Sequence, residues 1–89
     1  MKVEIQYKAQ LRQLRGLGAE VIELEDDTLL KDLIKSIAEQ HGDRMASLLL
    51  EDSEPSPSLL CFLSGEELSM NEALRDGHCI TLMTPISGG

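Results

Sequence analysis

Residues 26–42 read DDTLLKDLIKSIAEQHG, and this stretch decides the fold. The side chains that recur at the three- and four-residue spacing of one helix face are Leu30, Leu33, Ile34, Ile37, Ala38 and His41. Asp26, Asp27 and Thr28 predict the start of the helix, because they can cap free amides and suit the positive end of the helix dipole. Gly42 predicts its end. We therefore expect an amphipathic helix over 28–41 whose apolar face belongs to the core.

Two strands and a short helix precede the long helix. Residues 3–7 alternate apolar and polar side chains, which is the period of a half-buried strand. Residues 9–15 are good helix formers, and Gly16 ends that short helix. Residues 20–24 predict a second strand, with imperfect alternation, that pairs with the first.

Further elements follow the long helix. In chain order we expect a helical turn within 43–50, an acidic Pro/Ser loop over 51–58 that forms neither a ladder nor a helix, an apolar strand over 59–63, a helical turn near 70–74 and a last strand over 78–83. The turn near 70–74 is indicated by SMNE at 69–72, a capping box with Ser at the cap and Glu three residues later.

The order of these elements predicts an α+β fold of the β-grasp (ubiquitin-like) type. A hairpin followed by a crossover helix and more strands forms a mixed sheet, with the first and last strands side by side and one long helix on one face. The 89 residues suffice for a single core. We expect one domain over 1–83 and a flexible, free C-terminal tail over 84–89 that ends in Gly-Gly.

The composition restricts the partners. With 8 basic and 16 acidic residues the net charge is −8, which repels phosphate backbones and anionic membranes and favours a partner with a basic docking face. No apolar run resembles a signal peptide or a bilayer span, so we expect a cytoplasmic protein.

The cysteines and histidines do not predict a metal site, because no pair of them has ligand spacing. Cys61 and Cys79 each lie in a predicted strand, and we expect both to be small core hydrophobes. His41 closes the long helix, where a cation suits the dipole.

The tail, TPISGG at 84–89, indicates the function. Pro85 has no N–H for a ladder, so the sheet should end near Met83. Gly88 and Gly89 have no side chains, so they can pass through a narrow tunnel and present a carboxylate to a partner's active site. That carboxylate reacts with sulfide, a thiol or an amine only after activation, for instance as an acyl-adenylate. The chain has no phosphate-binding glycine loop, so we expect it to carry the chemistry, bind no cofactor and catalyse nothing by itself.

Over essentially its whole length the sequence resembles the MoaD/ThiS family of ubiquitin-like sulfur carriers. The residues that carry the resemblance are AQLRQL at 9–14, LRDG at 74–77 and PISGG at 85–89. The length and the helix after the first strand resemble the small subunit of molybdopterin synthase. The chain departs from the family pattern at Met83-Thr84-Pro85, where an aromatic residue and two prolines are common, at His78, where an acidic residue is common, and in the longer loop 51–58.

The resemblance implies that an ATP-dependent activating enzyme adenylates the Gly89 carboxylate. A sulfur donor of the cysteine desulfurase or rhodanese type then converts it to a thiocarboxylate. The acceptor would be an enzyme such as the molybdopterin synthase large subunit, in molybdenum cofactor biosynthesis. The alternatives are a carrier for thiamine, tRNA thiolation or cysteine synthesis, a modifier conjugated to lysines, and a binding module in which the tail does nothing.

We expect the partner-binding residues to be Leu60, Phe62 and Met83, with Pro85, Ile86 and Ser87 of the tail. One helix can cover only one face of the sheet, while strand 59–63 is apolar on both sides. The first three residues should therefore form an apolar patch on the face opposite the helix.

Overall fold

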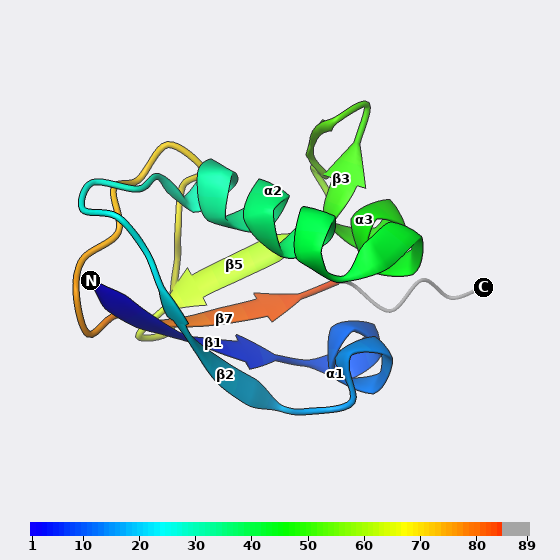
Figure 1. Cartoon of the computed structure of the whole chain (residues 1–89), viewed down its shortest axis with the longest axis horizontal. Helices are drawn as coiled ribbons and strands as arrows, with labels where there is room; N and C mark the ends of the chain where they lie inside the picture. Colours follow the sequence, from blue (N-terminus) through cyan, green and yellow to red (C-terminus); the bar gives the residue numbers. More distant parts are fainter. Residues whose placement is uncertain (85–89) are drawn as a thin grey trace.

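The computed structural model describes residues 1–84, as a five-stranded sheet with helices on one face and a separate two-stranded ladder (Figure 1). In chain order the elements are β1 (Lys2–Tyr7), α1 (Ala9–Arg15), β2 (Ala19–Glu23), α2 (Leu30–Gln40), α3 (Gly42–Leu49), β3 (Leu50–Glu51), β4 (Glu54–Pro55), β5 (Leu60–Leu63), β6 (Glu66–Glu67) and β7 (Cys79–Met83). The strand order is β2-β1-β7-β5-β6, with β1 and β7 parallel and the other pairs antiparallel. This topology is the β-grasp arrangement that the sequence predicted.

The core lies between the sheet and α2. Val3, Ile5 and Tyr7 of β1 point inward and are buried, which confirms the predicted alternation. The apolar stripe of α2 is also confirmed, because its buried residues are Leu30, Leu33, Ile34, Ile37 and Ala38. Gly16 follows α1 with φ +78°, a left-handed conformation that favours glycine, so the predicted end of this short helix is confirmed.

The long helix starts two residues later than the sequence predicted. The predicted side-chain cap is also wrong. The helix begins at Leu30 without a side-chain cap. The Thr28 hydroxyl instead donates to the Glu25 carbonyl oxygen at 2.7 Å. The first amides of α2 are satisfied from far along the chain: Leu30 N–H donates to the Glu72 carbonyl and Lys31 N–H to the Met70 carbonyl, both at 3.0 Å. Tertiary partners have replaced the local cap.

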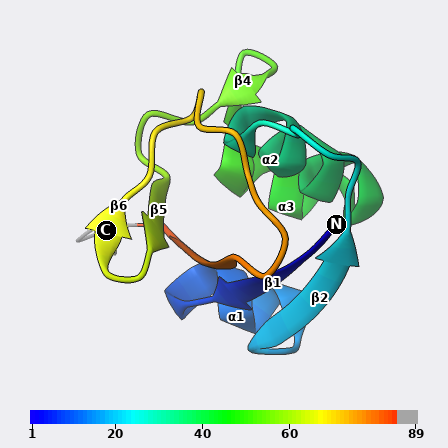
Figure 2. The same ribbon diagram turned by 90° about the vertical axis from the view of Figure 1, so that its left-hand side faces the viewer.

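The same contacts explain why only the start of the predicted helical turn near 70–74 forms, with the Ser69 hydroxyl oxygen accepting from Asn71 N–H at 3.3 Å. Glu72 N–H donates to the Ser69 carbonyl at 3.0 Å, which closes a single turn, and Ala73 then forms a β-bridge with Leu29. Figure 2 shows this connection between β6 and β7 rising to the start of α2 and returning to the sheet. The Leu74 N–H, which would donate to the Met70 carbonyl in a helix, donates instead to the Thr28 carbonyl at 2.8 Å, so the turn does not continue.

The region between α2 and β5 is more ordered than the sequence predicted. The turn expected within 43–50 is a complete helix, α3, and β3 and β4 form a small ladder inside the segment predicted to have none. Asp52 and Ser53 have φ of +53° and +67°, as a tight two-residue hairpin turn requires. Lys35 of α2 forms a solvent-exposed ion pair with Glu54 of this hairpin at 2.7 Å.

The two cysteines differ. Cys61 is buried in the core, as expected, but Cys79 is exposed, so its predicted core position is wrong. The reason is the phase of β7: Ile80 and Leu82 occupy the inward positions, and Cys79 therefore faces away from α2. None of the helices within residues 1–84 has the length and apolar character needed to cross a membrane.

Candidate functional site

Five of the predicted site residues lie outside the described part of the chain. They are Pro85, Ile86, Ser87, Gly88 and Gly89. The structure does describe the point at which these residues join the fold, and the three predicted partner-binding residues of the sheet.

Residues 82–84, which we call the root of the tail, lie at the end of a strand in the middle of the sheet. β7 lies beside β1, with Leu82 opposite Tyr7, and Lys8 N–H donates to the Leu82 carbonyl at 3.0 Å. Thr84, which the sequence assigned to the tail, is only 6% exposed, and its hydroxyl donates to Gln10 Oε1 of α1 at 3.3 Å. The chain beyond Thr84 therefore starts from a fixed position beside α1.

The structure brings Leu60, Phe62 and Met83 together. Leu60 lies opposite Met83 across β5 and β7, and Phe62 lies opposite Thr81, so these side chains share the face that points away from α2. All three are half-buried rather than fully exposed. We call Leu60, Phe62 and Met83 the open-face patch. It lies beside the last residue before the tail.

The rest of this face is less apolar. Glu67 of β6 lies opposite Phe62 and places an exposed carboxylate at the edge of the open-face patch. Val21 of β2, at the far edge of the sheet, is 64% exposed. Between the central strands β1 and β7, the Cys79 thiol donates to Glu4 Oε2 at 3.4 Å. Burial and the Glu4 carboxylate raise the pKa of Cys79.

A polar network that sequence reasoning missed lies on the inward side of β2. The Glu20 carboxylate accepts from Tyr7 Oη at 2.5 Å, and from Arg15 at 3.1 Å and 3.0 Å. His41 Nε2 is buried without a hydrogen-bond partner within residues 1–84 and lies 3.9 Å from Glu20 Oε2. The imperfect alternation of β2 was the available signal, because Glu20 occupies an inward position opposite Ile5.

The network shifts the pKa of its members. Partial burial opposes ionisation of Glu20, but the hydrogen bonds from Arg15 and Tyr7 and the Arg15 charge outweigh it, so its pKa lies below the ordinary value. Burial, followed by the hydrogen bond to Glu20, raises the pKa of Tyr7. The hydrogen bond to Glu20 raises the pKa of Arg15. An ionised Glu20 therefore ties α1 and β2 to β1.

We expect Glu20→Gln to lower the free energy of unfolding at pH 7 by about 1–2 kcal/mol, because hydrogen bonds to a charged acceptor are lost or weakened. A depressed folded pKa stabilises the fold above the unfolded value of about 4.3, and this stability is lost as the pH falls through the folded pKa. The gap between variant and wild type should therefore close in acid. Urea unfolding across this pH range measures it. Glu23→Gln on the same strand is the control, and an equal gap at all pH values would contradict the charge's role.

The described residues offer little chemistry of their own. Burial raises the pKa of the Cys61 thiol to about 12, with the charge of Glu67 adding to the effect, so this thiol stays protonated near neutrality. No three His, Cys, Asp or Glu side chains within 1–84 are grouped so that they could hold a metal ion. The features that the structure offers are a held tail root and an apolar patch beside it.

Comparisons with known proteins agree with this geometry. The model of the ThiS family matches residues 5–89. Small archaeal modifier protein 3 of Haloferax volcanii is 28% identical over 93 residues, covering 100% of both chains. The molybdopterin synthase sulfur carrier subunit of Haemophilus influenzae is 29% identical over 87 residues, covering 98% of this chain and 99% of its own. The crystal structure of SAMP1 from Haloferax volcanii superposes with a TM-score of 0.84 at 21% identity, covering 100% of both chains, which confirms the fold.

Proposed function

Because the chain belongs to the ThiS family of ubiquitin-like sulfur carriers, we propose that it carries sulfur on the Gly89 carboxylate and donates it in molybdopterin synthesis. The observation that carries this proposal is the extent of the family match, which runs over residues 5–89 and so includes the diglycine. The molybdopterin assignment is supported by the similarity to a molybdopterin synthase sulfur carrier subunit over nearly the whole length of both chains.

The proposed chemistry starts with an ATP-dependent activating enzyme. The Gly89 carboxylate displaces pyrophosphate from ATP and becomes an acyl-adenylate. The outer sulfur of a persulfide on a cysteine desulfurase or rhodanese-type donor attacks the carbonyl carbon, and AMP leaves, which gives an acyl disulfide. A second thiol then attacks the donor's sulfur, so that a disulfide forms with the donor and the thiocarboxylate is released. The thiocarboxylate sulfur then displaces a leaving group from a carbon of the substrate held by the acceptor enzyme, which gives a thioester. Water hydrolyses the bond between this sulfur and the Gly89 carbonyl carbon, so that the carboxylate is restored and the sulfur stays on the substrate. In each step this chain supplies the acyl group, while the partners bind ATP and catalyse.

The structure supports a docking mode for these steps. The open-face patch would pack against the partner, while Pro85, Ile86 and Ser87 lead the diglycine into its active site. Thr84 is held against α1 and Met83 is paired with Leu60, so a partner seated on the patch has the start of the tail at a fixed place. Burial of half-exposed apolar side chains drives such association, and the net charge of −8 favours a partner with a basic rim.

The proposal is tested by reconstitution. The chain is incubated with the activating enzyme, ATP and a sulfur source, and intact mass shows whether one oxygen is replaced by sulfur. The thiocarboxylate is then mixed with the molybdopterin synthase large subunit and its substrate. Sulfur transfer supports the proposal, whereas a thiocarboxylate that this acceptor leaves intact would contradict the molybdopterin assignment, and thiamine, tRNA thiolation and cysteine synthesis acceptors are then tested in the same way.

A second candidate function is modification of proteins, because a small archaeal modifier protein is 28% identical over the whole of both chains. In that case the acceptor of the activated Gly89 acyl group is a lysine amine rather than sulfide. Mass spectrometry of trypsin-digested cell extracts, searched for lysines that carry residues 76–89 of this chain, separates the two functions, because Arg75 is the last tryptic site before the diglycine. Conjugates that depend on Gly89 would establish the modifier role, and their absence together with thiocarboxylate would establish the carrier role.

The size of residue 88 should control activation. We expect the yield of thiocarboxylate to fall in the order Gly88, Gly88→Ala, Gly88→Val, because a side chain narrows the fit in the partner's channel and restricts positive φ. Intact mass after a fixed incubation measures the yield. Circular dichroism should show the same fold for all three chains. Equal yields would mean that activation does not depend on the size of this residue.

A further inference from the structure

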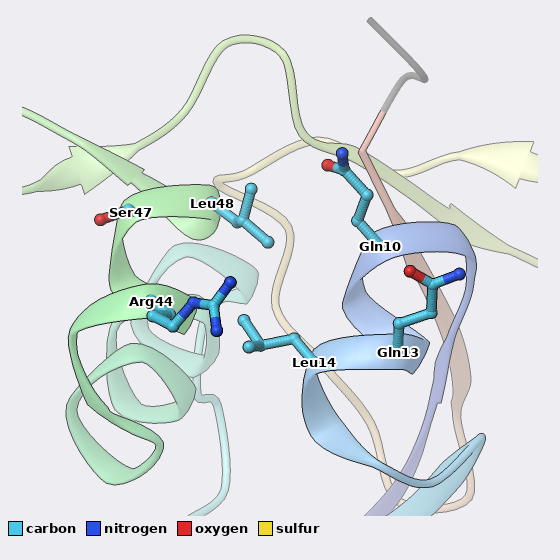
Figure 3. Close-up of a pocket in the computed structure, with 6 residues that line it drawn as sticks. All are labelled: Gln10, Gln13, Leu14, Arg44, Ser47 and Leu48. Atoms are coloured by element: carbon cyan, nitrogen blue, oxygen red, sulfur yellow. The ribbon is translucent and has the colours of Figure 1, made fainter.

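A groove of about 680 Å³ separates α1 from α3. The residues that line it are Gln10, Gln13, Leu14, Arg44, Ser47 and Leu48. Figure 3 shows Leu14 and Leu48 extending toward each other from the two helices, with the Arg44 guanidinium beside them and the two glutamine amides at the α1 wall. The groove therefore combines a small apolar floor with one cation and hydrogen-bonding amides.

This groove lies next to the root of the tail. Gln10 lines it and also accepts the hydrogen bond from the Thr84 hydroxyl at 3.3 Å. In Figure 1 the end of β7 lies between α1 and α3, at the end of the molecule where these helices meet. The last described residue is thus in contact with the groove wall.

We propose that the groove between α1 and α3 binds the chain's own residues 85–89, with Ile86 between Leu14 and Leu48 and the Gly89 carboxylate beside Arg44. The order of side chains in the tail corresponds to the order of features in the groove. An apolar pair, Pro85 and Ile86, follows the root directly, and a carboxylate lies three residues further on. Ser87 can hydrogen-bond the amides of Gln10 or Gln13.

The tail is long enough to occupy this groove. Five extended residues span up to about 17 Å, which exceeds three turns of a helix, and none of this length is needed to reach the groove because Thr84 already touches Gln10. Ile86 follows Thr84 by two residues, so its side chain can reach the apolar floor formed by Leu14 and Leu48.

Charge favours the same placement. The surface of the chain is acidic, with a net charge of −8, so a terminal carboxylate is repelled from most of it. Arg44 is exposed and forms no ion pair with a carboxylate of residues 1–84, whereas Arg15 and Lys35 are paired with Glu20 and Glu54. A carboxylate delivered to Arg44 gains a charge-assisted hydrogen bond without breaking an existing pair.

Because the tail is covalently attached beside the groove, even a weak intrinsic affinity is enough to populate the docked tail. A short linker gives an effective concentration of about a millimolar or more, so an intrinsic dissociation constant of about 1 mM would populate the docked tail in at least half of the molecules. Where the proposed function holds, a docked tail cannot enter the activating enzyme. The apparent affinity for that enzyme would then be lowered about twofold by the fraction of free tail.

The test is made on the full chain by NMR and does not depend on any enzyme. We expect methyl–methyl NOEs from Ile86 to Leu14 and Leu48. In Arg44→Glu these NOEs should weaken at least twofold, and the amide shifts of Gly88 and Gly89 should move toward those of a free peptide. Arg12→Glu is the matched control, because it makes the same charge change on α1 at an exposed residue that does not line this groove. It should leave the tail signals unchanged.

Three results would overturn the proposal. The first is absence of the NOEs from Ile86 in the wild-type chain. The second is an equal response of the tail to Arg44→Glu and Arg12→Glu, which would reflect general charge. The third is loss of the NOEs on dilution, which would show that the groove takes the tail of a second copy. Because the measurement uses the isolated chain, its failure leaves the sulfur-carrier function untouched, and failure of the reconstitution leaves the docked tail untouched.

Discussion

A chain that ends at Gly88 should support no ATP–pyrophosphate exchange by the activating enzyme, although it folds as the full chain does. Adenylation requires a carboxylate at the reacting position, and removal of one residue withdraws it by about 3.5 Å, more than the tolerance of a near-attack geometry. The fold should be unaffected, because every buried core residue of the structure lies between Val3 and Leu82. Exchange of labelled pyrophosphate into ATP measures the loss, and urea unfolding measures the stability.

The control for this truncation is Ser87→Ala, which alters the tail without changing its length. It should retain exchange within a few-fold of the full chain. Normal exchange by the chain that ends at Gly88 would refute the assignment of Gly89 as the carrier residue, and thus the proposed function. Loss of exchange together with a lower unfolding midpoint would instead mean that Gly89 contributes to the fold.

Met83→Asp should weaken the complex with the acceptor enzyme by about 30-fold, or about 2 kcal/mol. Met83 lies on the open face opposite Leu60 and directly before Thr84, so in the proposed docking mode a partner that receives the tail covers it. A carboxylate there would be desolvated without a counter-charge and would also remove an apolar contact. The inward neighbours Leu82 and Ile80 are unchanged, so the variant should fold.

Isothermal titration calorimetry with the acceptor measures this effect. Val21→Asp is the matched control, because Val21 is an exposed apolar residue on the same face but at the far edge of the sheet. It should change the affinity by less than about threefold. Equal losses in both variants would show that the whole face responds to charge, and unchanged affinity in Met83→Asp would show that the open-face patch is not the docking surface.

Much of the fold could be predicted because the signals are local and periodic. The alternation of apolar and polar residues in β1 and the apolar stripe of α2 show which side of each element is apolar. Burial of these two sides in one core follows directly. Gly16 marks the end of α1 through its own backbone conformation. These features together predict a mixed sheet with a helix across it, and the diglycine indicates a carrier function from the sequence alone.

The tertiary structure decided where hydrogen bonds form between distant residues. The cap predicted for α2 is chemically possible, but carbonyls of Met70 and Glu72 reach the same amides and displace it. The capping residue predicted at Ser69 is used, because its hydroxyl oxygen accepts from Asn71 N–H, but the helical turn stops there since Leu74 N–H donates to the distant Thr28 carbonyl. Local sequence can show that a donor or acceptor needs a partner, but not which distant segment supplies it.

The surroundings of the site also depended on packing. The sequence placed Leu60, Phe62 and Met83 on one face, which follows from the two-residue period of strands, and the register of β5 against β7 then made them neighbours. No sequence period predicts the network around Glu20 or the groove between α1 and α3. Each joins residues of different elements, whose relative placement is set by the core. The sequence by itself therefore determined the elements, their apolar faces and the reactive tail. Only the tertiary structure decided the helix start, the burial of Thr84 against α1 and the groove beside the tail, because these follow from the relative placement of segments that are distant in the chain.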